Sequence, residues 1–342
     1  MSNAQLPILA VTLGDPAGIG PEIVAAALAD PTAHNNARGL AVGDLAALER
    51  AIEVQKLNVR AVAVKAVEDA VFAPGTIEIL DLGLTDKNLA MGIVSAEAGA
   101  SAIAAIETAT KLAMEGLVSG IVTAPINKEA IWAAGSKHLG HTEMLGELTG
   151  APSSDTMFVV KGLKLFFTTR HVPLRTALDQ LSIERVEKAI KKAALALETF
   201  GQGQTRLAVA AVYPHGGENG NFGREEIDIL KPAIENCRAL GIDVVGPIPA
   251  DSVFHHGLTG RYDGILTHFH DQGHIPSKTY DFDGTVSVTI GLPILRTSVD
   301  HGTAFDIAGK GIASSGTMSA AFEVGADYSK YAAKIREAFK TA

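Results

Sequence analysis

The stretch Pro7-Ile-Leu-Ala-Val-Thr-Leu-Gly-Asp-Pro-Ala-Gly-Ile-Gly-Pro-Glu22 has the pattern of a strand joined to a helix through a glycine-rich turn. Its first seven residues form an apolar run, which is typical of a strand that a parallel sheet buries on both faces. The following Ile23–Ala29 has helical composition, and Pro21 falls in the first helical turn, where proline is favoured. The turn contains Gly18-Ile-Gly20 but lacks the third glycine of the dinucleotide fingerprint GxGxxG. A purely structural turn and a ligand-binding turn therefore remain equally open.

The alternation of strand and helix continues along the chain. Apolar strand segments recur at Gly39–Gly43, Val62–Val64, Ile77–Leu80 and Gly120–Thr123, with helical segments between most of them. Such alternation predicts a doubly wound α/β sheet rather than a barrel.

The composition changes after Lys128. Met157–Lys161 and Leu163–Thr169 are rich in β-forming residues and meet at Gly162, which predicts an antiparallel hairpin. A hairpin is foreign to a purely parallel sheet. We therefore predict two α/β domains with some antiparallel strands, one formed by residues 1–130 with 285–342 and the other by residues 131–284.

The net charge is −9 at pH 7, and this excludes a general nucleic-acid binder, which needs a surplus of Lys and Arg. An anionic substrate must then be bound by a local basic cluster. Cys237 is the only cysteine, so neither an intramolecular disulfide nor a cysteine-based zinc site is possible. No apolar run approaches the roughly 18 residues that cross a bilayer, and no signal peptide is visible. We expect a cytoplasmic protein that binds neither nucleic acid nor membrane.

Three histidines, His171, His215 and His270, each follow a buried strand segment. Their spacing matches no local metal motif, and any one of them alone is more often structural than a ligand. Strand ends of one sheet can converge on one point, however, so three histidines in equivalent places predict a site for Zn²⁺, Co²⁺ or Mn²⁺. His268 is expected to support this site rather than to bind the metal.

Several other polar residues are candidates for binding an anion or moving a proton. Lys278 and Arg296 lie on or near expected strand ends, and His141 and Thr142 lie at the start of an expected helix. These four residues could bind a phosphate or carboxylate. The alternatives are salt bridges for the two cations and simple helix capping for Thr142. The candidate acid–base or orienting carboxylates are Asp251 and Asp271.

These motifs together resemble the family of 4-hydroxythreonine-4-phosphate dehydrogenases of vitamin B6 biosynthesis. The matching segments span nearly the whole chain and are Gly14-Asp-Pro-Ala-Gly-Ile-Gly-Pro-Glu22, Gly140-His-Thr-Glu143, His270-Asp-Gln-Gly273 and Arg296-Thr-Ser-Val-Asp-His-Gly-Thr303. The resemblance implies a two-domain fold like that of isocitrate and isopropylmalate dehydrogenases. It also implies a homodimer with the active site at the interface, NAD or NADP, and a divalent metal (Zn, Co, Mn or Mg). The domain of residues 1–130 and 285–342 would then serve the cofactor, and that of residues 131–284 would serve metal, substrate and dimerisation.

The resemblance also implies roles for individual residues. The implied metal ligands are His171, His215 and His270, one of them supplied by the dimer partner. The implied substrate contacts are His141, Thr142, Lys278 and Arg296, with Ser287 standing where the family has an asparagine. The expected catalytic groups are Asp271, Asp251 and Lys278. The segment His301-Gly-Thr-Ala-Phe-Asp-Ile-Ala-Gly-Lys-Gly311 is similar to the adenine-binding loop of isopropylmalate dehydrogenases, and the cofactor contacts expected in it are His301, Gly302, Thr303, Asp306 and Gly309.

The implied reaction is a metal-dependent oxidation by NAD(P)⁺, with decarboxylation, of a 4-phosphorylated 3-hydroxy acid of the 4-hydroxythreonine 4-phosphate type. Asp271-Gln-Gly-His-Ile-Pro276 is closer to a paralogous branch that oxidises D-threonate or D-erythronate 4-phosphate, and His274 is the residue in it expected to mark that branch. Two readings from other classes stay open. They are a phosphate acyltransferase-like enzyme, which uses no nicotinamide, and a non-catalytic binder of phosphorylated metabolites.

Overall fold

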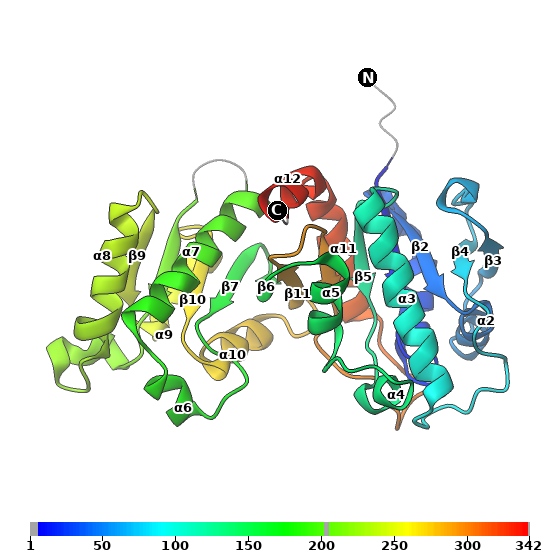
Figure 1. Ribbon diagram of the computed structural model, residues 1–342, viewed down its shortest axis with the longest axis horizontal. Helices are drawn as coiled ribbons and strands as arrows, with labels where there is room; N and C mark the ends of the chain where they lie inside the picture. Colours follow the sequence, from blue (N-terminus) through cyan, green and yellow to red (C-terminus); the bar gives the residue numbers. More distant parts are fainter. Residues whose placement is uncertain (1–5, 202–204, 341–342) are drawn as a thin grey trace, which may run out of the picture. The chain divides into compact units, whose positions relative to one another are not determined.

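The computed structural model describes residues 6–201 and 205–340, and the chain divides into two compact units (Figure 1). Unit 1 is Met1–Asp155 with Val286–Ala342, and unit 2 is Thr156–Thr285. The sequence placed the first domain boundary near residue 130. The first observed boundary falls later because α4 (Lys128–Ala133) and α5 (His141–Thr149) both pack on α3 (Ala96–Glu115) of unit 1.

Unit 1 is built on a sheet with the strand order β3-β4-β2-β1-β5-β12-β11. Neighbouring strands are parallel except for β11, which runs antiparallel to β12. The strands are β1 (Ile8–Thr12), β2 (Arg38–Gly43), β3 (Arg60–Val64), β4 (Thr76–Asp81), β5 (Gly120–Thr123), β11 (Val286–Ile290) and β12 (Arg296–Ser298). The expectation of a mostly parallel sheet with some antiparallel pairing is confirmed.

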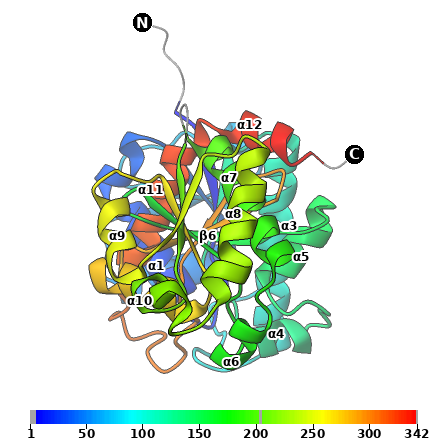
Figure 2. The same cartoon turned by 90° about the vertical axis from the view of Figure 1, so that its left-hand side faces the viewer.

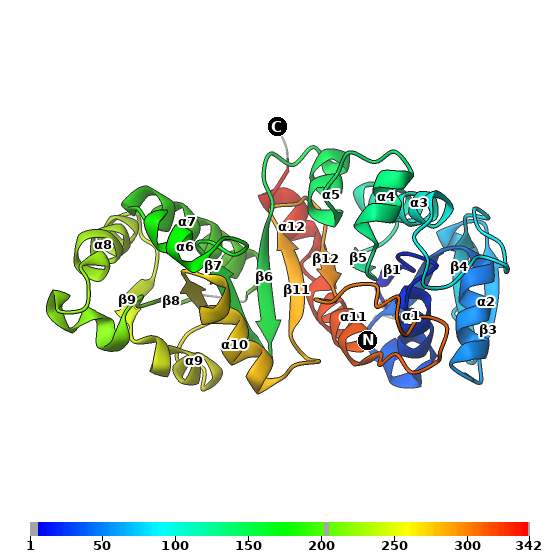
Figure 3. The same cartoon turned by 90° about the horizontal axis from the view of Figure 1, so that it is seen from below.

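Helices cover both faces of the unit 1 sheet. Figure 3 shows α3, with α4 and α5, on one face, and α1 (Gly20–Ala29) and α11 (Gly316–Ser329) on the other. The remaining helices of unit 1 are α2 (Leu45–Val54) and α12 (Ala332–Ala338). Ser95 caps α3 by accepting a hydrogen bond from the amide of Ala98. The buried face of α3 is largely alanine, and a side chain at Gly99 would collide with the carbonyl of Ala130, so these small residues let α4 pack closely.

Unit 2 contains the strand order β6-β7-β10-β8-β9. The strands are β6 (Asp155–Val160), β7 (Leu163–Phe167), β8 (Leu207–Ala210), β9 (Val244–Ile248) and β10 (Gly264–Thr267). β6 and β7 pair antiparallel across the turn at Gly162, which confirms the predicted hairpin, and the other pairs are parallel. Figure 2 shows α7 (Ile183–Phe200) and α8 (Lys231–Ala239) on one side of these strands, with α9 (Ala250–Leu258) and α10 (His270–Tyr280) on the other. α6 (Leu174–Asp179) and a π-helical turn at Glu226–Leu230 complete the unit.

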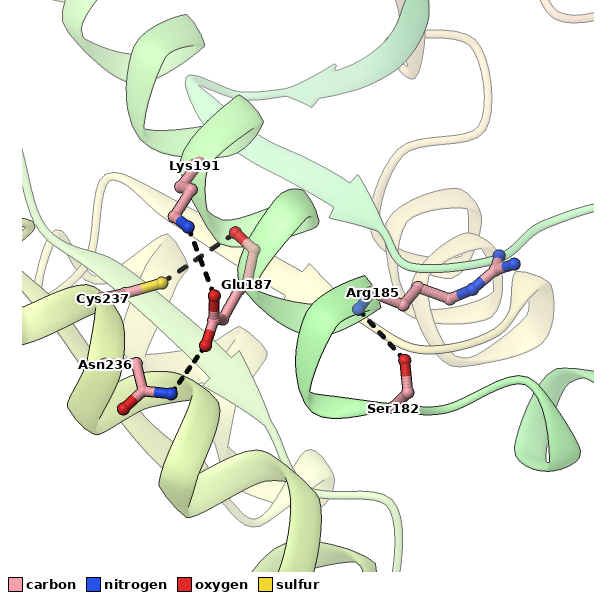
Figure 4. Close-up of polar contacts among 6 residues, drawn as sticks. All are labelled: Ser182, Arg185, Glu187, Lys191, Asn236 and Cys237. Atoms are coloured by element: carbon pink, nitrogen blue, oxygen red, sulfur yellow. Dashed lines mark hydrogen bonds and ion pairs between the residues drawn. The ribbon is translucent and has the colours of Figure 1, made fainter.

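Polar contacts fix the start of α7 and its packing against α8 (Figure 4). The hydroxyl of Ser182 accepts a hydrogen bond from the amide of Arg185 and caps the helix. The carboxylate of Glu187 accepts from Lys191 Nζ at 3.2 Å and from Asn236 Nδ2 at 2.7 Å. The thiol of Cys237 is fully buried beside the carbonyl of Glu187, 3.9 Å away. This cysteine is therefore part of the α7–α8 packing.

No helix within residues 6–201 and 205–340 combines the length and the apolar composition needed to cross a bilayer.

Candidate functional site

Arg296 opens β12 and is a buried cation in unit 1, with 6% of its surface exposed. Its Nε and Nη2 donate to Thr123 Oγ1 at 3.1 and 2.8 Å, and its Nη1 donates to Thr289 Oγ1 at 2.9 Å. Within the described residues no carboxylate pairs with it. Burial lowers the pKa of Arg296 to about 10, so it stays charged at neutral pH. Because a buried charge without a counter-ion is costly, this guanidinium is suited to binding an anion.

His141 is a second group suited to an anion, and it begins α5. Its Nε2 atom is shielded from solvent and has no hydrogen-bond partner among the described residues. Burial, and then the charge of Arg296, hold the pKa of His141 well below its usual value. The ring is therefore neutral at pH 7 and can present an N–H to a ligand. The start of a helix adds backbone amides and a favourable dipole.

The predicted capping role of Thr142 is wrong. α5 begins one residue earlier, its N-cap is Gly140, and no side chain caps it. Thr142 therefore lies inside the first turn.

A row of four hydroxyl residues crosses the unit 1 sheet at one level. The register pairs Thr12 with Thr123, Thr123 with Ser298, and Ser298 with Ser287. Register partners point to the same face, and so do residues two apart on a strand, so Ser287 shares the face of Thr289 and Arg296. The hydroxyl of Thr12 is buried and has no partner among the described residues. Hydroxyl groups that can donate to phosphate oxygens thus line the face that carries Arg296.

The histidines predicted to bind metal lie in unit 2. The ring centres of His171 and His270 are 6.0 Å apart. Nδ1 of His270 lies 2.8 Å from Asp271 Oδ1, which leaves Nε2 as the ligand atom. A carboxylate behind a histidine fixes the tautomer and orientation that metal binding requires. Asp271 therefore stands where it can orient His270.

The ring of His274 packs against the ring of His270. It is buried, stacks on His270 with ring centres 4.1 Å apart, and stacks on Phe167 at 5.0 Å. Phe158 adds an edge contact at 4.4 Å. A side chain at Gly273 would meet the Phe167 ring at 2.5 Å, so glycine is needed for α10 to approach β7. The plane of the His270 ring is thus set by an aromatic stack.

His215 lies in a turn of unusual hand. His215, Gly216, Gly217, Glu218 and Asn219 all have positive φ, between 45° and 81°. Each non-glycine residue in this conformation costs roughly 1–2 kcal/mol. Nδ1 of His215 lies 2.8 Å from Glu218 Oε1, so this ring also has a carboxylate behind it. The buried Glu226 holds the start of the turn by accepting from the amides of Val212 and Tyr213.

His268 ties together the strand ends from which these histidines extend. Its Nε2 lies 2.8 Å from the carbonyl of Ala210, the last residue of β8, and its Nδ1 lies 3.1 Å from the hydroxyl of Thr168, which follows β7. Burial lowers the pKa of His268 to about 4. Both ring nitrogens of His268 are therefore occupied within the protein, and its supporting role at a metal site stays a prediction.

The prediction that Lys278 lies on or near a strand end is wrong. It occupies the last turn of α10, and its Nζ lies 5.4 Å from the centre of the Phe282 ring. α10 was not expected because Gly273 and Pro276 are poor helix formers. Asp251 is an exposed residue in the first turn of α9.

The imidazole side chains are suitable ligands for a divalent metal ion, but those of one chain do not form a complete metal site. Within the described residues no group of three His, Cys, Asp or Glu side chains is arranged to hold an ion. Two imidazoles bound to one ion at about 2.1 Å place their ring centres about 5–6 Å apart, which the His171–His270 pair satisfies. His215 and His270 each have a carboxylate on Nδ1, which leaves Nε2 as the candidate ligand atom.

Comparisons with known proteins decide the family. Residues 35–325 match the model of the family "Pyridoxal phosphate biosynthetic protein PdxA". The chain is 51% identical over 337 residues to a Cutibacterium acnes protein named "Putative D-threonate 4-phosphate dehydrogenase", covering 98% of this chain and 97% of the relative. The chain belongs to the PdxA family.

Relatives in the PdxA family carry two substrate names. A Symbiobacterium thermophilum protein, 49% identical over 96% of this chain and 98% of its own length, shares the D-threonate 4-phosphate name. A crystal structure of 4-hydroxythreonine-4-phosphate dehydrogenase from Klebsiella pneumoniae is 43% identical, with a TM-score of 0.89, over 96% of this chain and 99% of that one. The predictions of the family, of the α/β fold and of a dehydrogenase are confirmed.

The loop predicted to bind the cofactor lies in unit 1 of this PdxA-family chain. His301 and Asp306 are exposed, and a side chain at Gly302 would meet open space, so the loop has room for a ligand. Two predicted contacts have other partners in the fold. The carbonyl of Thr303 accepts from the amide of Ile19, and the amide of Gly309 donates to Glu22. A cofactor would therefore meet other atoms of those two residues.

The glycine-rich turn is structural. Its amides are used within the protein, because Asp15 donates to Pro125, Ala17 and Gly18 donate to Asp15, and Ile19 donates to Thr303. These amides cannot cradle a phosphate as well. The turn instead holds the loop predicted to bind the cofactor, and no sequence spacing indicated this contact.

Sequence reasoning missed several site residues. Thr123 and Thr289 hold Arg296, Glu226 holds the His215 turn, and Glu22 holds the loop that contains Gly309. Threonines that end or line a buried strand were the only available signal for the first two. The two glutamates lie in helical segments, where an acid is usually solvated, and only their burial reveals the role.

Proposed function

We propose that this protein oxidises the 3-hydroxyl group of a 4-phosphorylated hydroxy acid, with D-threonate 4-phosphate as the first candidate. The observation that carries the anion specificity is Arg296, a buried cation whose protein partners are hydroxyl groups. The substrate name comes from the relatives of 44–51% identity, which carry the D-threonate 4-phosphate name.

A second candidate is 4-hydroxythreonine 4-phosphate, which the similar crystal structures carry in their names. The two acids differ at C2, where one has a hydroxyl and the other an ammonium group. Phosphate recognition by Arg296 and His141 would be common to both. Discrimination must then come from whatever group faces C2.

The residues have separate roles in this proposal. Arg296 and the neutral His141 hold the phosphate, the first by charge and the second by an N–H donor. The hydroxyl row that includes Ser287 adds donors on the same face. Because the phosphate is held in one place, the position of the substrate carbon that is oxidised is restricted as well. Lys278 remains a candidate phosphate contact or proton donor, and Asp251 a candidate acid or base.

His171, His215 and His270 would hold a divalent ion, with one of them contributed by a second subunit. Such an ion would supply Lewis acidity that lowers the pKa of the substrate hydroxyl. Asp271 and Glu218 keep the imidazoles of His270 and His215 in the tautomer that leaves Nε2 available. Reconstitution of the protein with different divalent metals would identify the ion that binds.

The loop from His301 to Gly311 would bind NAD or NADP, which accepts the hydride. Oxidation at C3 places a ketone β to the carboxylate, and such an acid loses CO₂ because the carbonyl accepts the electron pair of the breaking bond. The chain therefore needs to orient the carbon, exclude water and return a proton. Lys278 and Asp271 are the groups proposed for proton transfer.

The test is a matrix of NAD(P)⁺ reduction assays. D-Threonate 4-phosphate, D-erythronate 4-phosphate and 4-hydroxythreonine 4-phosphate are each assayed with NAD⁺ or NADP⁺ and with Zn²⁺, Co²⁺, Mn²⁺ or Mg²⁺. We expect metal-dependent turnover, highest with D-threonate 4-phosphate. If no combination reduces NAD(P)⁺, the proposal fails. Formation of an acyl phosphate would then indicate the transferase class, and phosphate-dependent ligand binding without turnover would indicate a non-catalytic binder.

A further inference from the structure

The loop from His301 to Ala313 is held at two places by the first α-helix and the turn before it. Near its start, the carbonyl of Thr303 accepts a hydrogen bond from the amide of Ile19 at 3.0 Å. A side chain at Gly18 would lie 2.9 Å from Thr303, so the turn and the loop are in direct contact there. This first contact uses backbone atoms only.

The second contact uses a buried carboxylate. Glu22 lies in the first turn of α1 with 2% of its surface exposed. Its Oε1 accepts from the amide of Gly309 at 2.6 Å, and its Oε2 accepts from the amide of Gly311 at 3.2 Å. Gln55 Nε2 lies 3.4 Å from the same Oε2 and 3.3 Å from the carbonyl of Ala313. One carboxylate thus sets the positions of two peptide groups in the loop.

The two glycines have left-handed backbones that fit this arrangement. Gly309 has φ +78° and Gly311 has φ +65°, which other residues adopt at a cost. A side chain at Gly311 would collide with the carbonyl of Val54, and one at Gly309 would press on Met91. The backbone is therefore confined on one side by packing and on the other by Glu22.

The charge of Glu22 also acts on Arg50. Burial lowers the pKa of Arg50, and the carboxylate opposes this shift. Arg50 Nη2 donates to the carbonyl of Pro16 at 2.8 Å, in the same turn that contacts Thr303. Glu22 and Arg50 therefore stabilise the turn and the loop as one assembly.

We propose that Glu22 is a positioning residue for the dinucleotide, acting through the backbone of Gly309 and Gly311. The carboxylate fixes the loop before the cofactor arrives, so the cofactor does not have to order it on binding. A glutamine could accept only one of the two amide hydrogens, and its NH₂ group would face the other. This inference rests on the proposed role of the loop in cofactor binding.

The chain offers a matched control in Glu78. This residue lies in β4 of the same unit, is 5% exposed, and accepts from the amides of Val71 at 2.9 Å and Phe72 at 2.7 Å. Glu78→Gln therefore removes the same chemistry at a place remote in sequence from the loop. Asp306→Ala, at an exposed residue of the loop itself, tests whether the loop binds the cofactor.

The experiment measures the dissociation constant of the dinucleotide for wild type, Glu22→Gln, Glu78→Gln and Asp306→Ala by calorimetry. Hydrogen exchange of the Gly309 and Gly311 amides and the split between KM and kcat are measured in parallel. We expect Glu22→Gln to weaken dinucleotide binding about tenfold, or about 1.4 kcal/mol. Its KM for the dinucleotide should rise with little change in kcat, and exchange at both glycines should quicken. Glu78→Gln should lose comparable stability and bind the dinucleotide like wild type.

The outcomes separate this inference from the proposed function. If Asp306→Ala weakens binding and Glu22→Gln matches Glu78→Gln, the positioning role is overturned and the cofactor site stands. If the wild type binds no dinucleotide, or Asp306→Ala has no effect, the proposed cofactor loop fails and the inference fails with it. Should Glu22→Gln not fold, Gln55→Leu replaces it, since this change removes the side-chain donor from both Glu22 and Ala313. Unchanged dinucleotide affinity in Gln55→Leu would then overturn the inference.

Discussion

The guanidinium of Arg296 is surrounded by hydroxyl groups rather than carboxylates. Hydroxyls satisfy the N–H donors but leave the positive charge uncompensated. A protein that buries a cation in this way loses stability unless an anion binds. The ligand-free protein should therefore be more stable without this charge, and only the wild type should respond to phosphate.

Arg296→Met tests this coupling. In phosphate-free buffer we expect the variant to unfold at a temperature equal to or above that of wild type, because the hydrocarbon fills much of the same space. Inorganic phosphate at 100 times its dissociation constant should stabilise wild type by about 2.7 kcal/mol and leave the variant unchanged. Thermal unfolding across a phosphate series measures both. Arg336→Met is the control, since Arg336 donates to the carbonyl of Ala113 on the surface of the same unit; equal phosphate responses in wild type and Arg296→Met would refute the coupling.

His268 makes unit 2 sensitive to acid. The folded pKa of about 4 lies below the unfolded value of 6.5, so the unfolded chain binds the proton first as pH falls. The stability is complete above pH 6.5 and is lost as pH falls toward 4, by roughly 3 kcal/mol for this group. We expect the gap in unfolding free energy between wild type and His268→Asn to narrow over that window. Urea unfolding at several pH values measures it, with the exposed His255→Asn as control, and a constant gap would contradict the assignment.

At the scale of elements, the apolar pattern of the sequence predicted those strands whose formation depends only on burial. Strands such as Leu207–Ala210 and Gly120–Thr123 are fully buried, so their sequences are continuous apolar or small runs. α10 was not predicted from the sequence because tertiary packing fixes its place. Gly273 packs against Phe167, and His274 lies within an aromatic stack. Gly273 and Pro276 have low helix propensity, and the packing of the helix outweighs this unfavourable contribution.

Gly273→Ala measures how tightly α10 is packed on β7. The added methyl group would lie 2.5 Å from the Phe167 ring, so the helix must shift and His270 with it. We expect a loss of roughly 1–3 kcal/mol in unfolding free energy, together with weaker metal binding. Gly146→Ala in α5 is the matched control, because its nearest neighbour is 3.9 Å away and alanine favours helices by about 1 kcal/mol. If both variants gain stability, α10 is less closely packed than described.

At the scale of the whole molecule, the sequence could not predict contacts between distant segments. Glu22 and Gly309 are 287 residues apart, and no spacing rule joins them. The first boundary between the units could not be predicted either, because it depends on α4 and α5 packing on α3. The three histidines predicted to bind metal were selected by their places after strands, and the structure brings the rings of His171 and His270 close together.

A metal site shared between two subunits should show complementation. His215→Ala and His270→Ala each remove one ligand and should be inactive alone. If His215 serves the site of the partner subunit, a mixed dimer contains one intact site, and random mixing should restore about a quarter of the wild-type activity. Metal-dependent NAD(P)⁺ reduction after mixing measures this. Mixing His215→Ala with itself is the control, and no recovery would place all three ligands in one chain.

The turn at His215–Asn219 winds with the opposite hand to an ordinary helix, and this limits what selection can change there. If Glu218 and Asn219 were randomised in a library and active clones were sequenced, Gly, Asn and Asp should dominate at position 219 and Glu and Asp at position 218, while Val, Ile and Thr should be absent from both. Charge and size would matter less than backbone freedom, apart from the hydrogen bond of Glu218 to His215. A library that accepts β-branched residues at both positions would show that the turn can reverse its hand without loss. The set of amino acids that these two codons accept therefore reports directly on the backbone geometry of the turn.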